Sequence, residues 1–361
     1  MSVWDDLDLL LDSPSSLTIT SNTRGTVKDN PSFKVDEDVS ALKKAIEGLG
    51  TTEKTLIEVL TQRSNAQRQL IAQAYEKATG RVTEILNLRL ERYAFRLTFI
   101  FIFFQKLVDD LKGDTQGDFE DVLVALVTPP AVFDCHEVIK AIKGAGTTES
   151  ILTEIFASKS NKQIKALSEA YMAETGKSVL HDLKGEVSGE YGKALLILAE
   201  GKRDESTHVD TAKAKADAKA LYEAGEKKWG TDEDKFIDIL CHRSIPQLRQ
   251  TLVEYKEISK KTLQESIESE MSGNLETLLV AVVKCVKNVP AYLAERLFKS
   301  MKGAGTTESI LTRIIVSRSE IDLMDIRAEY KKLFGYSLYS QLESEVSGCY
   351  GDVLKHLCGQ D

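Results

Sequence analysis

The chain has 361 residues, of which 42% are hydrophobic and 29% charged, a composition that supports a large folded core and excludes disorder throughout. Its formal net charge of −9 repels nucleic acid and anionic membranes on average, so binding to either needs a bridging cation or a local basic patch. We therefore expect no nucleic-acid partner. The five cysteines are scattered and odd in number, and the amino terminus is acidic where a signal peptide would be basic. These features predict reduced thiols in the cytosol.

Residues 1–36 are expected to form an amino-terminal tail. Its apolar residues have helical spacing, with acids between them: Val3, Trp4, Leu7, Leu10 and Leu11. Ser and Pro dominate the residues that follow. Two interpretations remain open, a short amphipathic helix that docks on a partner or on this protein's own concave face, and a disordered tail.

From Asp36 onward, apolar residues recur with helical spacing and the same order of segments appears four times. In each unit, one amphipathic segment ends at a glycine-containing turn and four further helices follow. In the first unit, Thr51 is expected to cap the second helix and Ser64 to begin the third. We predict an all-α fold of four five-helix repeats: 37–130, 131–201, 220–289 and 290–361. A polar linker, 202–219, is longer than the other junctions and suggests that the repeats form two pairs.

Each repeat also contains a glycine-containing turn followed by an acid. Three such pairs are 40 residues apart and one is 64 apart: Gly146 and Glu186, Gly230 and Glu270, Gly305 and Glu345, and Gly50 and Asp114. Acids fill 56 of the 361 positions, so four matched positions are not expected from composition alone. Glycine lets backbone carbonyls turn outward together, and Ca²⁺ binds oxygens of carbonyls, carboxylates and water. Each pair therefore predicts the two halves of a calcium site, with the acid in the turn between the fourth and fifth helices. The alternative is helix-ending turns beside solvated acids.

The first repeat is 24 residues longer between turn and acid, and the surplus fits an insert at 82–105. Its end, TFIFIFFQ, is unusual for the surface of an acidic cytosolic protein. Val82 is encoded by GT plus a third base, Gln105 can be encoded by CAG, and Phe and Ile codons are rich in pyrimidines. The segment thus has the outline of a retained in-frame intron. The alternative is a membrane-dipping hairpin, and either would expose an aggregation-prone apolar patch unless it packs.

The repeated pattern resembles the annexin family. The family's GxGT(D/T)E-like segment occurs four times: Gly48 to Leu60, Gly144 to Phe156, Lys228 to Leu240 and Gly303 to Ile315. The resemblance covers nearly the whole chain from Asp36. Three loops have GTTE where annexins often have GTDE. In the second repeat, Lys159 replaces the arginine of the other three: Arg63, Arg243 and Arg318.

The resemblance implies a curved disc with calcium loops on its convex face and the tail on its concave face. It also implies calcium-dependent binding to acidic phospholipids such as phosphatidylserine, and phospholipase A2 inhibition through substrate masking. The implied calcium ligands are carbonyl oxygens closed by one acid in each repeat: Ile46, Gly48, Gly50 and Asp114; Ile142, Gly144, Gly146 and Glu186; Gly225, Lys228, Gly230 and Glu270; Met301, Gly303, Gly305 and Glu345. Trp229 lies inside the third loop, where it is expected either to contact the membrane interface or to pack within its repeat.

Enzyme activity is not expected. The turn at Gly144–Thr147 lacks the lysine of a phosphate-binding P-loop, and the segment GEVSG misses the nucleophile-elbow spacing. We expect a monomer in the cytoplasm that binds plasma or vesicle membranes peripherally when calcium rises. A different class of function, a helical scaffold that binds protein partners through its concave face and tail, would not require calcium.

The intron hypothesis is testable at the transcript. We expect sequencing across the codons of Gly80 to Lys106 to find a shorter message that lacks codons 82–105. A transcript pool that contains only the longer message would contradict this interpretation.

Overall fold

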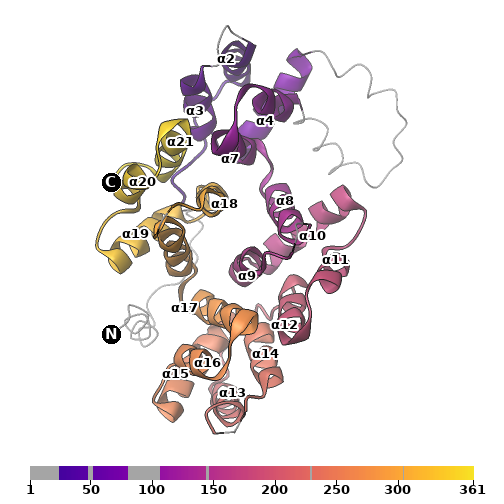
Figure 1. Ribbon diagram of the computed structural model, residues 1–361, viewed down its shortest axis with the longest axis vertical. Coiled ribbons are helices and arrows are strands. Elements are labelled where there is room, and N and C mark those ends of the chain that lie inside the picture. Colours follow the sequence, from indigo (N-terminus) through magenta and orange to yellow (C-terminus); the bar gives the residue numbers. More distant parts are fainter. Residues whose placement is uncertain (1–23, 48–51, 80–105, 144–145, 228–229, 304) are drawn as a thin grey trace. The chain divides into compact units, whose positions relative to one another are not determined.

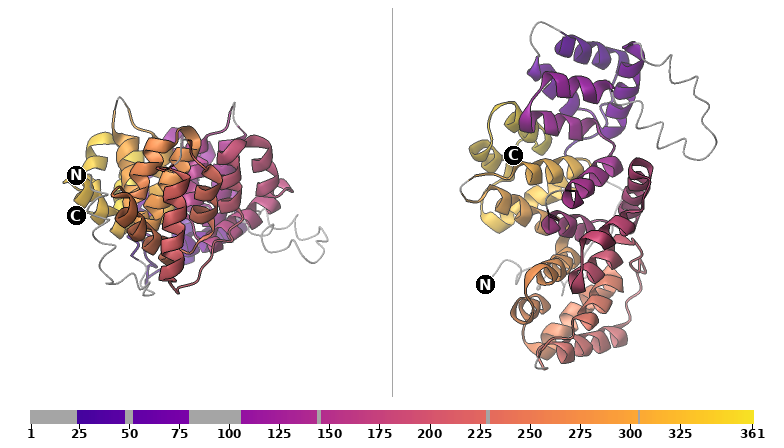
Figure 2. Two further views of the ribbon diagram at one scale, coloured as in Figure 1. Left: turned by 90° about the horizontal axis from the view of Figure 1, so that it is seen from below. Right: turned by 45° about the vertical axis from the view of Figure 1, so that its right-hand side comes forward.

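The computed structural model describes residues 24–47, 52–79, 106–143, 146–227, 230–303 and 305–361. Within these ranges every regular element is a helix (Figures 1 and 2), which confirms the predicted all-α fold. The first part of the tail and the insert 82–105 lie outside the described residues. The chain divides into two compact units, which are described in turn.

The first unit contains residues 134–292. It holds the second and third repeats, with helices α8 (Pro130–Ile142), which enters it from the other unit, α9 (Glu149–Ser158), α10 (Asn161–Thr175), α11 (Val179–Glu186), α12 (Gly189–Ala199), α13 (Thr211–Ala224), α14 (Glu233–His242), α15 (Ile245–Ser259), α16 (Leu263–Glu270) and the first part of α17 (Gly273–Met301). Within this unit α12 packs against α9 and α14.

The second unit contains residues 24–133 and 293–361 of the described chain. It holds the first and fourth repeats, with helices α2 (Val35–Glu47), α3 (Glu53–Thr61), α4 (Asn65–Ala78), a helical segment at 106–114, α7 (Gly117–Val127), the second part of α17, α18 (Glu308–Arg318), α19 (Leu323–Phe334), α20 (Leu338–Glu345) and α21 (Gly348–Cys358). Here α7 packs against α18, and α21 against α3. The repeats are therefore paired as first with fourth and second with third.

The linker 202–219 does not separate the two units, contrary to the interpretation based on its length and polarity. It lies entirely within the first unit. The guanidinium of Arg203 explains why, because its Nη1 donates to the carbonyl oxygens of Leu240 at 2.8 Å and Arg243 at 2.9 Å. Arg203 thus attaches the predicted linker to the end of α14, and from Thr211 onward the predicted linker is part of α13.

Local sequence determines where several helices begin. Ser64 caps α4 as predicted: its Oγ accepts from the backbone N of Gln67 at 3.3 Å, and the Gln67 side chain accepts from the backbone N of Ser64 at 3.2 Å. This reciprocal pair is a capping box, and α10 begins in the same way. The prediction for Thr51 was wrong. The residue before α3 is Thr52, and its side chain makes no capping bond.

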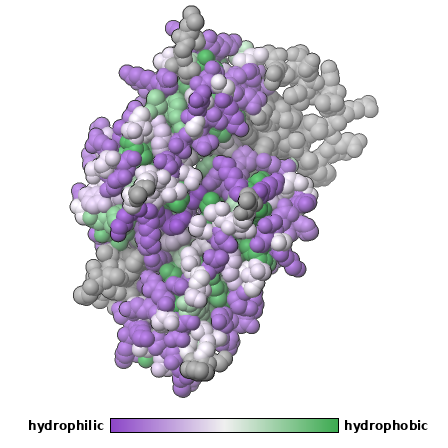
Figure 3. Space-filling model, in the orientation of Figure 1, coloured by the Kyte–Doolittle hydropathy of each residue, from purple (hydrophilic) through white to green (hydrophobic). Residues whose placement is uncertain are grey.

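Apolar residues at helical spacing form the core. The predicted stripes of α2 and α3 are buried: Val39, Leu42 and Ile46, and Leu56, Ile57 and Leu60. Figure 3 shows a mainly hydrophilic surface on the visible face, with hydrophobic residues in small scattered patches. Burial of the stripes follows from the hydrophobic effect.

Only α17, among the described helices, is long and apolar enough to cross a membrane by length and composition. It is interrupted at Asn288, whose φ of −162° and ψ of 104° are not helical. The Asn288 Oδ1 accepts from the backbone N of Ala291 at 3.1 Å, so the side chain starts a second helix there. Of the most apolar 18-residue stretch of α17, 72% is buried. The helix therefore has the character of a core helix.

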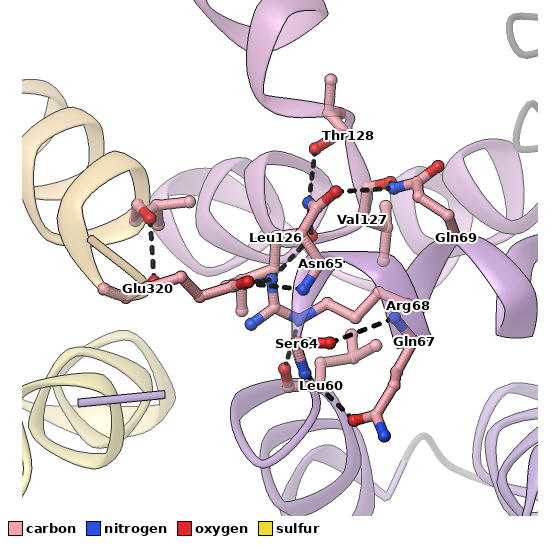
Figure 4. Close-up of polar contacts among 12 residues, drawn as sticks. Leu60, Ser64, Asn65, Gln67, Arg68, Gln69, Leu126, Val127, Thr128 and Glu320 are labelled. Atoms are coloured by element: carbon pink, nitrogen blue, oxygen red, sulfur yellow. Dashed lines mark hydrogen bonds and ion pairs between the residues drawn. The ribbon is translucent and has the colours of Figure 1, made fainter. Parts of the chain in front are cut away.

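A buried polar cluster joins the first and fourth repeats in the second unit (Figure 4). Arg68 in α4 is 1% exposed and donates from Nε to the carbonyl of Leu60 at 2.7 Å. Glu320, between α18 and α19, accepts from the backbone N of Asn65 at 2.6 Å and lies 3.6 Å from Nη1 of Arg68. Burial raises the pKa of Glu320, and the Arg68 charge opposes this rise. The pairing keeps two desolvated charges compensated.

The described end of the tail, 24–34, is attached to the fourth repeat within the same unit. The backbone N of Val27 donates to the carbonyl of Ser319 at 3.0 Å, and that of Met324 donates to the carbonyl of Arg24 at 3.0 Å. A Cβ on Gly25 would lie 2.5 Å from the backbone of Glu320. The absence of a side chain therefore allows this close approach.

The substitution of lysine for arginine in the second repeat preserves an interhelical ion pair. Lys159 Nζ lies 2.7 Å from Asp134 Oδ2, and both side chains are 8% exposed. The first and third repeats have an arginine paired with an aspartate at the same place, whereas in the fourth repeat the arginine pairs along the chain: Arg63 with Asp38, Arg243 with Asp217, and Arg318 with Asp322. The pair connects the first helix of the repeat to the end of the second.

We expect Lys159→Met to lower the free energy of unfolding by about 3 kcal/mol, because it removes the cation that compensates the buried Asp134 carboxylate. Lys159→Arg should retain most of the stability. Urea denaturation gives the measurement, and Lys162→Met, at an exposed lysine, is the control. Equal urea midpoints for the two methionine variants would contradict the role of this pair.

Candidate metal sites

A backbone hydrogen bond closes each glycine-containing loop. The N–H before the second helix donates to a carbonyl near the end of the first helix in every repeat: Thr52 to Ala45 at 3.1 Å, Thr148 to Ala141 at 2.8 Å, Asp232 to Ala224 at 2.9 Å and Thr307 to Ser300 at 2.8 Å. The donor follows the acceptor by seven residues in the first, second and fourth repeats and by eight residues in the third. This closure does locally what a capping side chain would otherwise do, since none of the four residues caps its helix through its side chain.

The loop glycines are required for backbone conformation rather than for space. Gly146, Gly230, Gly303 and Gly305 have φ angles of 119°, 86°, 125° and 126°, which side-chain-bearing residues rarely adopt. A Cβ at any of them would meet nothing within 4 Å. All four glycines are exposed.

The acids lie at the carboxyl ends of the fourth helices. Glu186, Glu270 and Glu345 are the last residues of α11, α16 and α20, and Asp114 is the last residue of the helical segment 106–114. The prediction that placed them in the following turn was off by one position. All except Glu270, which is half-buried, are exposed. Each carboxylate thus stands at a helix end that is open to solvent.

A threonine joins loop and acid-bearing helix in two repeats. Thr147 Oγ1 donates to the carbonyl of Glu186 at 3.5 Å, and Thr231 Oγ1 donates to the carbonyl of Glu270 at 3.2 Å. In these repeats the residue after the last loop glycine is therefore in contact with the residue that carries the acid. The two halves predicted from a spacing of 40 residues are neighbours.

In the first repeat, Ile46 is buried in the last turn of α2, and Gly48 and Gly50 lie outside the described residues. Burial, followed by the hydrogen bond and charge of Asp110, raises the pKa of Tyr75 in α4, and the charges of Glu47 and Asp114 raise it further. The end of α2 and the acid are thus both close to this tyrosine.

In the second repeat, Ile142 is the last residue of α8 and is buried. Gly146, which precedes Thr147, and Glu186, whose carbonyl accepts the Thr147 hydrogen bond, are both exposed. Gly144 lies outside the described residues.

The loop of the third repeat is one residue longer than the others. The closing hydrogen bond shows which residue of this loop corresponds to the first carbonyl donor of the other repeats. Gly225 follows Ala224, the acceptor of that bond, as Ile46 follows Ala45 in the first repeat. This places Gly225 at the position expected of a carbonyl donor. It is buried, and a Cβ there would lie 3.2 Å from the ring of Phe236. Lys228 and Trp229 lie outside the described residues.

In the fourth repeat, Met301 is buried at the end of α17, and Gly303 and Gly305 are exposed. Glu345 Oε1 accepts from Gln341 Nε2 at 2.8 Å, which orients the carboxylate along α20. Burial, then the neighbouring Tyr336, then the charge of Glu345 raise the pKa of Tyr330. Tyr330 thus corresponds to Tyr75 of the first repeat, close to the acid of its own repeat.

The donor chemistry fits a hard cation. No group of three or more His, Cys, Asp or Glu side chains suited to a metal occurs among the described residues, so sites rich in side-chain ligands are not what this part of the chain offers. Carbonyl oxygens with a single carboxylate are ligands that Ca²⁺ accepts. The loop closures and the threonine contacts were not anticipated from the sequence, although Thr follows the last loop glycine in every repeat.

The effect of the positive φ at a loop glycine can be separated from the general effect of replacing a glycine by alanine. We expect Gly146→Ala to lower the free energy of unfolding by about 1 kcal/mol, because alanine is strained at this positive φ. Gly185→Ala is the matched control: it too has nothing within 4 Å of the added Cβ, but it lies within α11, where alanine is favoured. Urea unfolding without metal measures both, and shifts of the same sign would contradict this account.

Comparison with known proteins agrees with this architecture. The annexin family model matches residues 37–82, 133–198, 216–282 and 292–357. Annexin A3 from Mus musculus is 52% identical over 338 residues, which cover 94% of this chain and 97% of the relative. Annexin A5 from Bos taurus is 45% identical over 336 residues, which cover 93% of this chain and 97% of the relative.

A solved structure of annexin III superposes with a TM-score of 0.85 at 51% identity, covering 96% of this chain and 100% of that chain. The segments LVALVTPPAVFD and GYSLYS resemble annexin III in particular, and the comparison confirms that similarity. The chain therefore belongs to the annexin family, whose members bind phospholipid in a calcium-dependent manner.

Proposed function

We propose that this chain binds Ca²⁺ at its glycine-containing loops and, through the ion, the headgroups of acidic phospholipids, phosphatidylserine among them. The observation that carries the proposal is the contact between loop and acid-bearing helix: Thr147 with Glu186, and Thr231 with Glu270. Calcium-bound annexin (Sm)1, a solved structure 33% identical with a TM-score of 0.75 that covers 94% of each chain, supports the choice of metal.

Each proposed site consists of oxygen donors only. In the second repeat the carbonyls of Ile142, Gly144 and Gly146 and the carboxylate of Glu186 would hold the ion, and the corresponding groups would do so in the other repeats. One carboxylate does not neutralise a divalent cation. A bound Ca²⁺ would therefore keep net positive charge and open coordination positions that a lipid phosphate fills.

This arrangement makes calcium and lipid binding interdependent. The affinity of a site for calcium alone is expected to be weak and to rise when lipid completes the coordination shell, and by linkage calcium raises lipid affinity by the same factor. Several weak sites on one chain add avidity. The net charge of −9 has the same consequence, because without a cation the protein and an acidic membrane repel each other.

Several finer features are part of the proposal. Trp229 would contact the membrane interface when its loop binds the ion. Phospholipase A2 would be inhibited by masking of its substrate rather than by contact with the enzyme. The chain would be a cytoplasmic monomer that binds plasma or vesicle membranes peripherally, and no residue is assigned a catalytic role.

A second candidate function is a helical scaffold that binds a protein partner at the tail. The observation that favours it is the surface beside the anchored residue Arg24, where Ile321 and Met324 are 40% and 42% exposed. This function predicts partner binding in the presence of a calcium chelator, which the lipid-binding function does not.

We expect Glu186→Gln combined with Glu345→Gln to weaken calcium-dependent pelleting with phosphatidylserine vesicles strongly, by about tenfold in the calcium midpoint, because two of the four sites lose their only carboxylate. Glu169→Gln with Glu343→Gln, at two exposed acids, removes the same charge elsewhere and should pellet normally. Unchanged pelleting of the first double variant would contradict the assignment of these acids.

A further inference from the structure

The third repeat contains a side-chain link that the other loops do not match. Glu226 directly follows Gly225, the expected first carbonyl donor, and Lys261 Nζ lies 2.9 Å from Glu226 Oε1 and 3.2 Å from Oε2. Ser266 Oγ also donates to Glu226 Oε1 at 2.9 Å. Lys261 precedes α16, and Ser266 lies within it. The start of the third loop is thereby connected to the helix that carries Glu270.

The same loop is connected to α16 at its other end. Thr231 Oγ1 donates to the carbonyl of Glu270 at 3.2 Å. The two contacts hold the beginning and the end of the loop against one helix. The two halves of the third site are therefore joined by side-chain contacts.

The corresponding residues of the other repeats make different contacts. Glu47 lies 3.9 Å from Lys43 on its own helix, and Lys302 lies over the ring of Phe298, also on its own helix, at 5.5 Å. In the second repeat the corresponding residues are Lys143 and Lys177, two like charges that form no ion pair with each other, and Lys177 lies 3.9 Å from Asp182 instead. Among the contacts of the described residues, this link is a property of the third repeat.

We propose that Glu226 is a positioning residue that holds the third loop ready for calcium, so that the third site fills at a lower calcium concentration than the others. The inference rests on the proposed function and specifies its order of occupancy. Ordering a loop costs free energy at the moment of binding, and a loop ordered beforehand avoids that cost. Lys261 is 50% exposed, so the ion pair itself adds little to global stability. Its effect is on the loop.

Two single variants separate loop ordering from simple electrostatics. Lys261 lies close enough to Glu270 for their charges to interact. If charge alone mattered, Lys261→Met would remove a competing cation and tighten metal binding, whereas Glu226→Gln would weaken it. If loop ordering matters, both variants weaken binding. The exchange Glu226→Lys with Lys261→Glu restores the link without changing net charge.

The measurement is terbium luminescence sensitised by Trp229, which reports metal at the third loop. The chain has two Trp residues, so every variant also carries Trp4→Phe to leave one donor, and calcium competition gives calcium affinity. We expect Glu226→Gln and Lys261→Met each to raise the midpoint about fivefold, and the exchanged pair to recover most of the loss. Lys260→Met is the control, because Lys260 Nζ donates to the Glu257 carbonyl at 2.8 Å rather than to the loop, and it should leave the midpoint unchanged.

Thermal unfolding in chelator should be the same for all variants, which shows that the effect is not a loss of folding. A midpoint for Lys261→Met that equals that of the control, or falls below it, overturns the inference, as does failure of the exchanged pair to recover. If the parent chain neither sensitises terbium nor pellets with calcium and vesicles, the proposed function fails and this inference with it. Normal pelleting with unchanged midpoints overturns the inference alone.

Discussion

The hydrogen bond that closes each glycine-containing loop is the constraint on which the candidate sites depend. It holds the N–H that starts the second helix against a carbonyl at the end of the first, so six or seven residues must turn back over a short distance. Gly146 and Gly305 have positive φ in these turns, and this conformation allows the backbone carbonyls to turn outward, as the proposed sites require. Without the closure, the loop would have no defined shape and no defined donors.

The second requirement is that a distant acid meets this loop. The fold achieves it by ending the fourth helix beside the loop, with Glu186 and Glu270 in contact with the threonine that follows the last glycine. A carboxylate at a helix carboxyl end is not stabilised by the helix dipole, which favours cations there. A cation bound between loop and helix end would relieve that unfavourable arrangement, and this is consistent with a metal site rather than with a solvated acid.

The net charge of the whole chain leads to the same requirement for a cation. An acidic protein and an acidic membrane repel each other, and the proposed sites, each with a divalent ion and one carboxylate, would reverse that repulsion locally. Structural ion pairs involve other residues: Lys159 and Asp134 are both buried, and the buried Arg68 pairs with Glu320, whose side chain is 32% exposed. The charged residues of this protein thus serve two purposes, one in holding repeats together and one at the exposed loops.

The sequence by itself determined the features that depend on near neighbours. Helical periodicity, the capping box at Ser64 and the recurring glycine turns specify the four helical repeats, because local propensity and amphipathic burial act over a few residues. The acids were identified because the spacing between the glycine-containing turn and the acid recurs among the repeats. The sequence misled us about the linker 202–219, since polarity cannot show that Arg203 donates to carbonyls of α14.

Tertiary structure alone decided which repeats pair and that Glu226 reaches Lys261 across 35 residues. Contacts of this kind depend on where whole helices pack, and no local pattern encodes that.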